Sequence, residues 1–248
     1  YDSTGKALAT SAQVDTITIN PAKFEKDSEE ENNKYKETIA TGLSQIFSLD
    51  YQETLDKLNS KSQVETIAKK VEQDKVDELK TWMEENEISV GINIDEDTKR
   101  YYPYSTVASA VIGFCGSDNQ GLSGIESKWD SVLTGTPGKI VSSQGSNQEE
   151  IPDAEETYIA AENGSDLTLT IDLNIQSIVE KYLKQAVEEN ECSRGGNVIA
   201  MDPSTGDILA MASYPDYDLN SPYTPNSTLA KTYDSLSNEE KNEALYKM

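Results

Sequence analysis

The sequence predicts an α+β fold with at least two hydrophobic cores, and three patterns lead to this prediction. Residues 38–86 carry apolar side chains at helical spacing, and residues 88–95 alternate between apolar and polar side chains as a half-buried strand does. Residues 166–212 indicate a strand, a helix and a hairpin in that order. Helices and strands that are segregated along the chain in this way are typical of α+β domains.

The N-terminal part predicts a turn, a strand and then a series of helices. Within residues 1–21, the β-branched side chains of Val14, Thr16 and Thr18 favour an extended backbone. The charged run 23–37 predicts a solvated loop and the start of a helix.

Capping boxes predict where the following helices begin. Asp50 precedes Glu53 by three residues, and Ser62 precedes Glu65 by the same spacing, before apolar residues at helical intervals. A further helix is expected to end near Asn86.

The middle of the chain predicts a strand over residues 88–95, a turn at 96–99 and a new element from Arg100. Ser123 and Glu126 form a third capping box, which predicts a helix with Trp129 and Val132 facing inward. Residues 139–143 indicate a further strand, and the polar run 144–165 indicates a boundary.

After this boundary the periodic patterns are sharper. Alternation at 167–171 predicts a strand, and Asp172 is placed to cap a helix whose wide apolar face includes Ile178 and Tyr182. The runs 198–201 and 208–212 predict a hairpin that is apolar on both faces, and therefore one in the middle of a covered sheet. A helical stretch is expected over residues 237–248.

Composition excludes several chemistries. The 248 residues include no His and two Cys, and the formal net charge is −24. Without His, neither a Ser-His-Asp triad nor an HExxH zinc site can form. The acidic charge excludes nucleic acid as a partner, because phosphate binding needs clustered Lys and Arg. We expect no metal and no cofactor, and no run of residues is apolar for long enough to span a membrane.

Serine acyl transfer stays open, because a Lys can replace His as its base. Residues Ser3 to Lys6 match SxxK as text, but Gly5 breaks the helix that such a motif should open. Residues Ser117 to Asn119 match SDN within a glycine-rich turn, and no KTG occurs. The residues by themselves therefore assign no catalytic, cofactor-binding or metal-binding position.

Three segments in order resemble class B penicillin-binding proteins, which are peptidoglycan transpeptidases. Residues 1–9 (YDSTGKALA) are similar to the segment that follows the membrane anchor in this family. Residues 100–138 resemble its pedestal, or dimerisation, domain, while 166–183 with 195–220 resemble the opening of its transpeptidase domain. The matching pedestal positions are Arg100, Tyr102, Pro103, Ala108, Gly113, Gly121, Gly124, Ile125, Glu126, Leu133, Gly135 and Gly138.

The resemblance implies a domain organisation for this chain, and an activity for the longer protein (the parent) of which it would be a part. Residues 1–160 would form an elongated pedestal of mixed strands with a helical head inserted at about 21–87, and residues 161–248 would begin the transpeptidase sheet. The parent would be anchored by an N-terminal transmembrane helix on the extracytoplasmic face of a bacterial membrane. It would cross-link peptidoglycan stem peptides by serine acyl transfer and bind β-lactams. The SxxK nucleophile is expected beyond Met248, so this part of the protein should be inactive. The hairpin at 198–212 would lack its neighbouring strands and helix, so residues after about 165 should be less well ordered than the pedestal.

Two other classes of protein remain as alternatives. One is a non-catalytic pedestal that docks cell-wall synthesis proteins or a second copy of itself. The other is a mixed-charge adhesin or binding domain without an enzyme parent.

Overall fold

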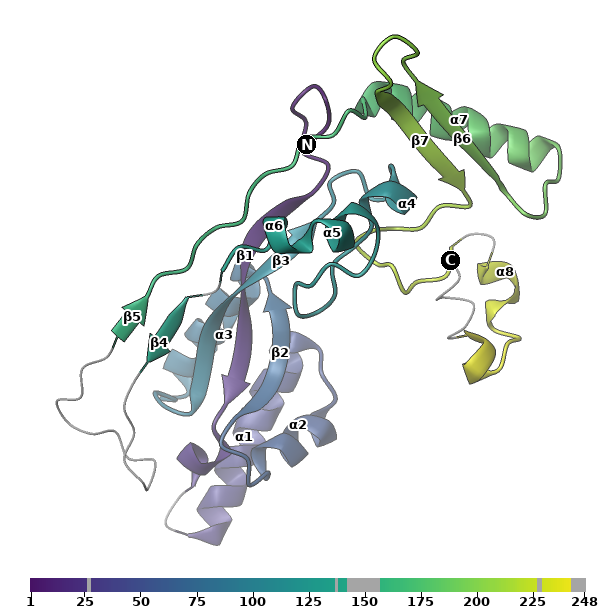
Figure 1. Ribbon diagram of the computed structural model, residues 1–248. Coiled ribbons are helices and arrows are strands. Elements are labelled where there is room, and N and C mark those ends of the chain that lie inside the picture. Colours follow the sequence, from purple (N-terminus) through teal and green to yellow (C-terminus); the bar gives the residue numbers. More distant parts are fainter. Residues whose placement is uncertain (26–27, 137, 142–156, 227–228, 242–248) are drawn as a thin grey trace. The chain divides into compact units, whose positions relative to one another are not determined.

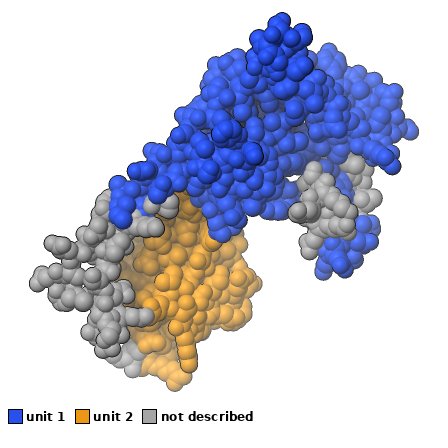
Figure 2. All heavy atoms as spheres, in the orientation of Figure 1, with its two compact units in different colours: residues 1–10, 100–248 blue, residues 11–99 orange. Residues whose placement is uncertain are grey.

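The computed structural model describes residues 1–248 apart from 26–27, 137, 142–156, 227–228 and 242–248. The chain forms two compact units, each described by itself below (Figure 2). The insert unit comprises residues 11–99, and the main unit comprises residues 1–10 together with 100–248. Among the described residues, no helix has the length and apolar character needed to cross a membrane.

The insert unit contains a three-stranded sheet and its helices. Its strand order is β2-β1-β3, and β1 pairs with β2 in antiparallel register from Asp15 opposite Val71 to Ile19 opposite Glu65. The elements are β1 (Thr10–Ile19), a 3-10 helix (Pro21–Phe24), α1 (Glu29–Phe47), α2 (Tyr51–Leu58), β2 (Glu65–Val71), α3 (Gln73–Glu85) and β3 (Ile92–Tyr101).

The core of the insert unit lies between the helices and one face of the sheet (Figure 1). Ile17 and Ile19 of β1 are fully buried against Ile39 and Leu43 of α1 and Leu79 of α3. The predicted cap of α2 is confirmed, since Asp50 Oδ1 accepts a hydrogen bond from Glu53 N at 2.8 Å. The expected helical head is therefore accompanied by strands.

Two local predictions in this unit are wrong, because sheet pairing outweighs the local signals. The Ser62–Glu65 pattern begins no helix: residues 65–71 form strand β2, and Glu65 accepts a hydrogen bond from the Ser60 hydroxyl instead. The predicted strand 88–95 begins only at Ile92 and runs straight through the expected turn at 96–99. The carboxylates of Asp95 and Asp97 accept hydrogen bonds from Thr18 and Thr16 of β1, which keep this acidic run extended.

The main unit contains short helices, two small two-stranded sheets and one long helix. Its elements are α4 (Ser109–Ile112), α5 (Gly124–Lys128), α6 (Asp130–Leu133), β4 (Lys139–Val141), β5 (Thr157–Ile159), α7 (Leu173–Glu189), β6 (Gly196–Met201), β7 (Ile208–Tyr214) and α8 (Ala230–Tyr233). β4 pairs with β5 and β6 pairs with β7, both antiparallel. Most of the expected boundary at 144–165, and residues 242–248 of the expected final helix, lie outside the described residues.

The predicted helix and hairpin are confirmed, and α7 lies along β7 (Figure 1). The helix is capped by Asp172, as predicted. Its buried face is narrower than expected, because Ile178 and Tyr182 are 56% and 61% exposed. The outer face of the hairpin is also open, since Ile199 is 61% exposed, so the hairpin is covered on one side within this structure.

Two further predictions in the main unit are wrong. The residues before Asp172 form no strand and meet the N-terminal segment through single backbone hydrogen bonds instead, one from Leu169 N to Tyr1 O at 2.9 Å. Ser123 makes no side-chain cap of α5; its hydroxyl accepts from Phe114 N at 3.3 Å, and Glu126 turns inward to Arg100. Trp129 and Val132 face outward, with Trp129 45% exposed.

Candidate functional site

One hydrophobic core of the main unit collects residues from every segment that carried the sequence resemblance. Leu8 comes from the first segment and Leu173 from α7, while Leu219 follows the hairpin. The pedestal segment contributes Tyr102, Ala108 and Ile112. Burial of these side chains is what brings the N-terminus, the 100–138 region and the start of α7 into one site.

Asp2 is the polar centre of this site, and its side chain is fully buried. Its Oδ1 accepts from Thr4 N at 2.9 Å and Lys6 N at 2.8 Å, and its Oδ2 accepts from Leu173 N at 3.1 Å. The Thr4 hydroxyl lies within 2.9 Å of both oxygens. Burial by itself would raise the pKa of Asp2, but these hydrogen bonds outweigh it and lower the pKa to about 2.

The N-terminus of α7 is satisfied jointly by two aspartates. Asp172 Oδ1 accepts from Asn174 N and Ile175 N, while Asp2 takes the N–H of Leu173, the first helical residue. Both carboxylates also complement the positive end of the helix dipole. The chain start is therefore fixed to α7 through a residue 171 positions away in sequence.

A buried ion pair lies beside this core. Arg100 Nε donates to Glu126 Oε1 at 2.8 Å, and the side chain of Glu126 is only 4% exposed. The Cys115 thiol donates to the other carboxylate oxygen at 3.5 Å, and Cys115 N donates to the hydroxyl of Tyr102. Burial, followed by the charge of Glu126, raises the pKa of Cys115 to about 12, which disfavours the reactive thiolate form.

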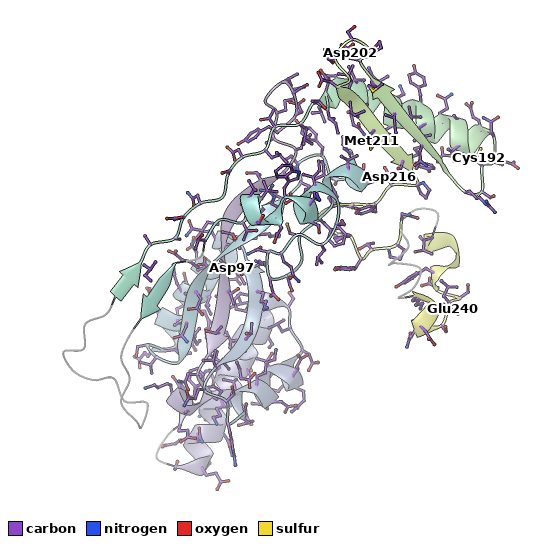
Figure 3. The ribbon with its side chains drawn as sticks, in the orientation of Figure 1. Asp97, Cys192, Asp202, Met211, Asp216 and Glu240 are labelled. Carbon is purple, nitrogen blue, oxygen red and sulfur yellow. The ribbon has the colours of Figure 1, made fainter. Side chains whose placement is uncertain are left out.

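Gln176 links α7 to the hairpin. Its amide donates to Met211 O at 2.9 Å and accepts from Met211 N at 2.8 Å, so one fully buried side chain pairs both backbone groups of a β7 residue (labelled in Figure 3). The same amide donates to Glu180 Oε1, which also accepts from Ala108 N at 2.7 Å. Burial raises the pKa of Glu180, although these hydrogen bonds act in the opposite direction.

Asn220 makes a second such pair of hydrogen bonds, here with both backbone groups of Tyr102 in the pedestal segment. Its Oδ1 accepts from Tyr102 N at 3.0 Å, and its Nδ2 donates to Tyr102 O at 2.9 Å. Leu219 N donates to Ser105 O at 3.0 Å next to it. The chain after the hairpin is thus held to residues 102–105 by backbone-directed bonds.

The two serine motifs both lie in turns. Ser3 lies in the turn closed around Asp2, and the Lys6 ammonium donates to Asn174 Oδ1 at 3.3 Å. Ser117 lies in an exposed turn, where its hydroxyl meets Asp118 Oδ1 at 3.5 Å. Both cysteines are free thiols, and the part of the chain that is described holds no group of three His, Cys, Asp or Glu residues suited to a metal ion.

The arrangement is thus a structural junction, in which carboxylates and amides bind backbone groups of distant segments. Similarity to known proteins identifies this chain as part of a class B penicillin-binding protein. The family model described as the Penicillin-binding Protein dimerisation domain matches residues 1–169, and the chain belongs to this family.

Curated relatives agree with this assignment. The chain is 30% identical over 220 residues to Stage V sporulation protein D of Bacillus subtilis (strain 168), covering 88% of this chain and 32% of the relative. It is 30% identical over 219 residues to Peptidoglycan D,D-transpeptidase FtsI of Escherichia coli (strain K12), covering 88% of this chain and 36% of the relative. The chain thus spans about a third of the length of these relatives.

Solved structures share the fold. Penicillin Binding Protein 2X from Streptococcus thermophilus superposes with a TM-score of 0.60 at 21% identity, over 89% of this chain and 34% of that one. The Penicillin-Binding Protein (PBP2) that was solved in complex with MreC from Helicobacter pylori gives a TM-score of 0.65 at 19% identity, over 97% of this chain and 45% of that one.

Proposed function

We propose that this chain is the pedestal, and the opening of the transpeptidase domain, of a membrane-anchored class B penicillin-binding protein. Residues 1–160 would be the pedestal with its head inserted at about 21–87, and residues 161–248 would begin the catalytic domain. The observation that carries this proposal is the shared core of Leu8, Tyr102, Leu173 and Leu219. That core joins all the segments that resemble the family.

The parent reaction would be serine acyl transfer between peptidoglycan stem peptides. A serine would attack the D-Ala-D-Ala carbonyl and release the terminal D-Ala, leaving an ester; a stem amine would then attack this ester, so that an amide bond forms and the serine hydroxyl is regenerated. We infer that this serine is not among these 248 residues. Ser3 and Ser117 support that inference, since the one lies in a closed turn and the other in an exposed one.

Labelling with a fluorescent penicillin tests this inference. β-Lactams acylate the same serine that attacks the stem peptide, so a covalent adduct would reveal a functional nucleophile. We expect no covalent labelling of the 248-residue polypeptide. Labelling that is lost in Ser3→Ala or Ser117→Ala would contradict the proposal and identify the serine.

A second candidate function is protein docking through the pedestal. The H. pylori protein of similar fold was solved in complex with MreC. In the main unit, Leu122, Trp129 and Val132 are apolar side chains with at least 38% exposure, in the region of α5 and α6. Such exposed apolar residues mark interaction surfaces when they are contiguous.

Light scattering after size exclusion tests the docking function for a second copy of the chain, and calorimetric titration tests it for an MreC-type partner. Trp129→Ser should weaken an interaction through this surface by about tenfold, because exposed aromatic residues are common hot spots. A strict monomer that binds no such partner would refute docking and leave the transpeptidase assignment standing. The parent's site of action would be the extracytoplasmic face of a bacterial membrane.

A further inference from the structure

The insert unit has an open pocket of about 440 Å³ between α1, the start of α2 and the end of α3. Trp82 and Tyr51 supply its aromatic surface. The polar lining comes from Lys34, Glu37, Thr38, Thr41, Gln45 and Asn86. This pocket lies outside the junction described above and has no part in the proposed transpeptidation.

A glycine inside α1 creates the seat for Trp82. Gly42 is buried, and a Cβ at this position would overlap the six-membered ring of the indole. Glycine inside a helix costs roughly 1 kcal/mol relative to alanine. That cost permits the indole to lie directly on the α1 backbone, where its position is fixed.

The indole is both a core residue and a pocket wall. Trp82 packs against the buried core of the insert unit and is only partly exposed, so its orientation is set by packing. Asn86 donates from Nδ2 to Trp82 O at 2.8 Å, which holds this amide at the pocket edge. Its amide oxygen then remains as an acceptor for a ligand.

The polar groups around the aromatic surface are mixed in kind and nearly balanced in charge. The hydroxyls of Thr38 and Thr41 donate to Lys34 O and Glu37 O of their own helix, so each keeps acceptor capacity towards the pocket. Within the described part of the chain, the side chains of Glu37 and Gln45 make no hydrogen bond. One carboxylate, one ammonium, two amides and two hydroxyls therefore surround an indole and a phenol.

This chemistry favours a sugar over other ligand classes. A phosphate-bearing ligand would need a surplus of cations, and an apolar peptide would leave the polar rim unpaired. A pyranose ring places C–H groups on the electron-rich face of an indole and hydroxyls at its rim, where carboxylate and amide groups can bind them. An acetamido substituent matches the two side-chain amides as donor and acceptor.

From this composition we propose that the pocket binds one ring of an N-acetylated hexose chain, stacked on Trp82 and hydrogen-bonded through Glu37, Gln45 and Asn86. The insert unit would then hold a glycan independently of any catalytic domain. The proposal goes beyond the proposed acyl transfer and does not depend on it.

The two tryptophans of the chain provide a matched test. The whole polypeptide is titrated with tetra-N-acetylchitotetraose in a Trp129→Phe background, where Trp82 is the remaining indole. We expect the fluorescence emission of Trp82 to be quenched or shifted to shorter wavelength, and the change to saturate with sugar concentration. In the matched Trp82→Leu protein, which keeps Trp129, we expect no change in emission.

Gln45→Ala, which changes an exposed residue and spares the core, should weaken binding by about tenfold in calorimetric titration. Cellotetraose, which lacks the acetamido groups, should bind to the unmodified chain no more tightly than the acetylated sugar binds to Gln45→Ala. Circular dichroism must show each variant folded. Absence of any response up to about 10 mM sugar, an equal response in Trp82→Leu, or equal binding of cellotetraose would each overturn the proposal.

Discussion

Replacement of Asp2 by Asn tests the junction at its most connected residue. The variant keeps the size of the side chain and one carbonyl oxygen, which can still accept from Thr4 N and Lys6 N. It replaces the second oxygen, which accepts from Leu173 N at 3.1 Å, by an NH₂ group. Two donors then face each other at the N-terminus of α7.

The expected cost is about 2 kcal/mol in the free energy of unfolding of the main unit. A buried N–H that loses its acceptor costs about 1–3 kcal/mol, and a hydrogen bond to a charged group contributes about 1.5–3 kcal/mol. Asp172→Asn is the matched control on the same helix terminus, because Asn caps helices about as well as Asp. We expect that control to stay within about 0.5 kcal/mol of the unmodified protein.

Urea unfolding followed through Trp129 in a Trp82→Phe background measures the main unit, since Trp82 lies in the insert unit. The pKa of Asp2 is about 2 in the folded protein, against 3.8 as its ordinary value. Its contribution is therefore fully present above about pH 4 and is lost as the pH falls towards 2. The difference between the unmodified protein and Asp2→Asn should shrink over the same interval. Equal stabilities at pH 7, or a difference that is constant from pH 7 to pH 2, would refute this account of Asp2.

Three further predictions concern separate contacts. Glu126→Gln should destabilise the main unit by about 3 kcal/mol in the same urea assay, because it breaks the ion pair that the buried Glu126 carboxylate makes with Arg100; an unchanged midpoint would contradict this. Gln176→Leu should lower the free energy of unfolding by about 2 kcal/mol, because both backbone groups of Met211 lose their partner. Hydrogen exchange along β7 should rise, and unchanged protection of β7 would contradict this role of Gln176. Gly42→Ala should destabilise the insert unit by about 1–3 kcal/mol through overlap with Trp82, although alanine favours helices, and a gain in stability by Trp82 fluorescence would disprove the close contact.

Local sequence signals predicted the elements whose start or turn is fixed by nearby residues. Asp50 and Asp172 accept the first N–H groups of α2 and α7, and the turn at 202–207 connects the paired strands β6 and β7. In each case the interacting groups lie within a few residues of one another. Sequence reasoning is reliable there because the competing alternatives are local too.

Long-range pairing explains the wrong predictions. Ser62 and Glu65 match a helix start, yet β2 gains a partner strand in β1, and this pairing outweighs the local pattern. Glu126 also matches a cap, but its carboxylate reaches Arg100. Trp129 lies just after the short α5 as its C-cap and is exposed, so the helical spacing used to place it inward does not apply to it.

The contacts of the junction could not be predicted from sequence patterns. Asp2 and Leu173 are 171 residues apart, and no spacing rule connects a single buried carboxylate to a distant helix. Gln176 and Asn220 are likewise polar residues whose partners are backbone groups of other segments. Only the resemblance of the separate segments to one family indicated that they belong together, and the shared core gives that indication its physical basis.

The central proposal is that this chain would be the pedestal and opening segment of a serine transpeptidase, with the nucleophile elsewhere in the longer protein. The most direct test is to label the full-length protein with a fluorescent penicillin, digest it and map the adduct by mass spectrometry. The account predicts one acylated serine in a peptide outside residues 1–248. An adduct on Ser3, Ser117 or any other residue of this chain, or no adduct on the full-length protein, would contradict it.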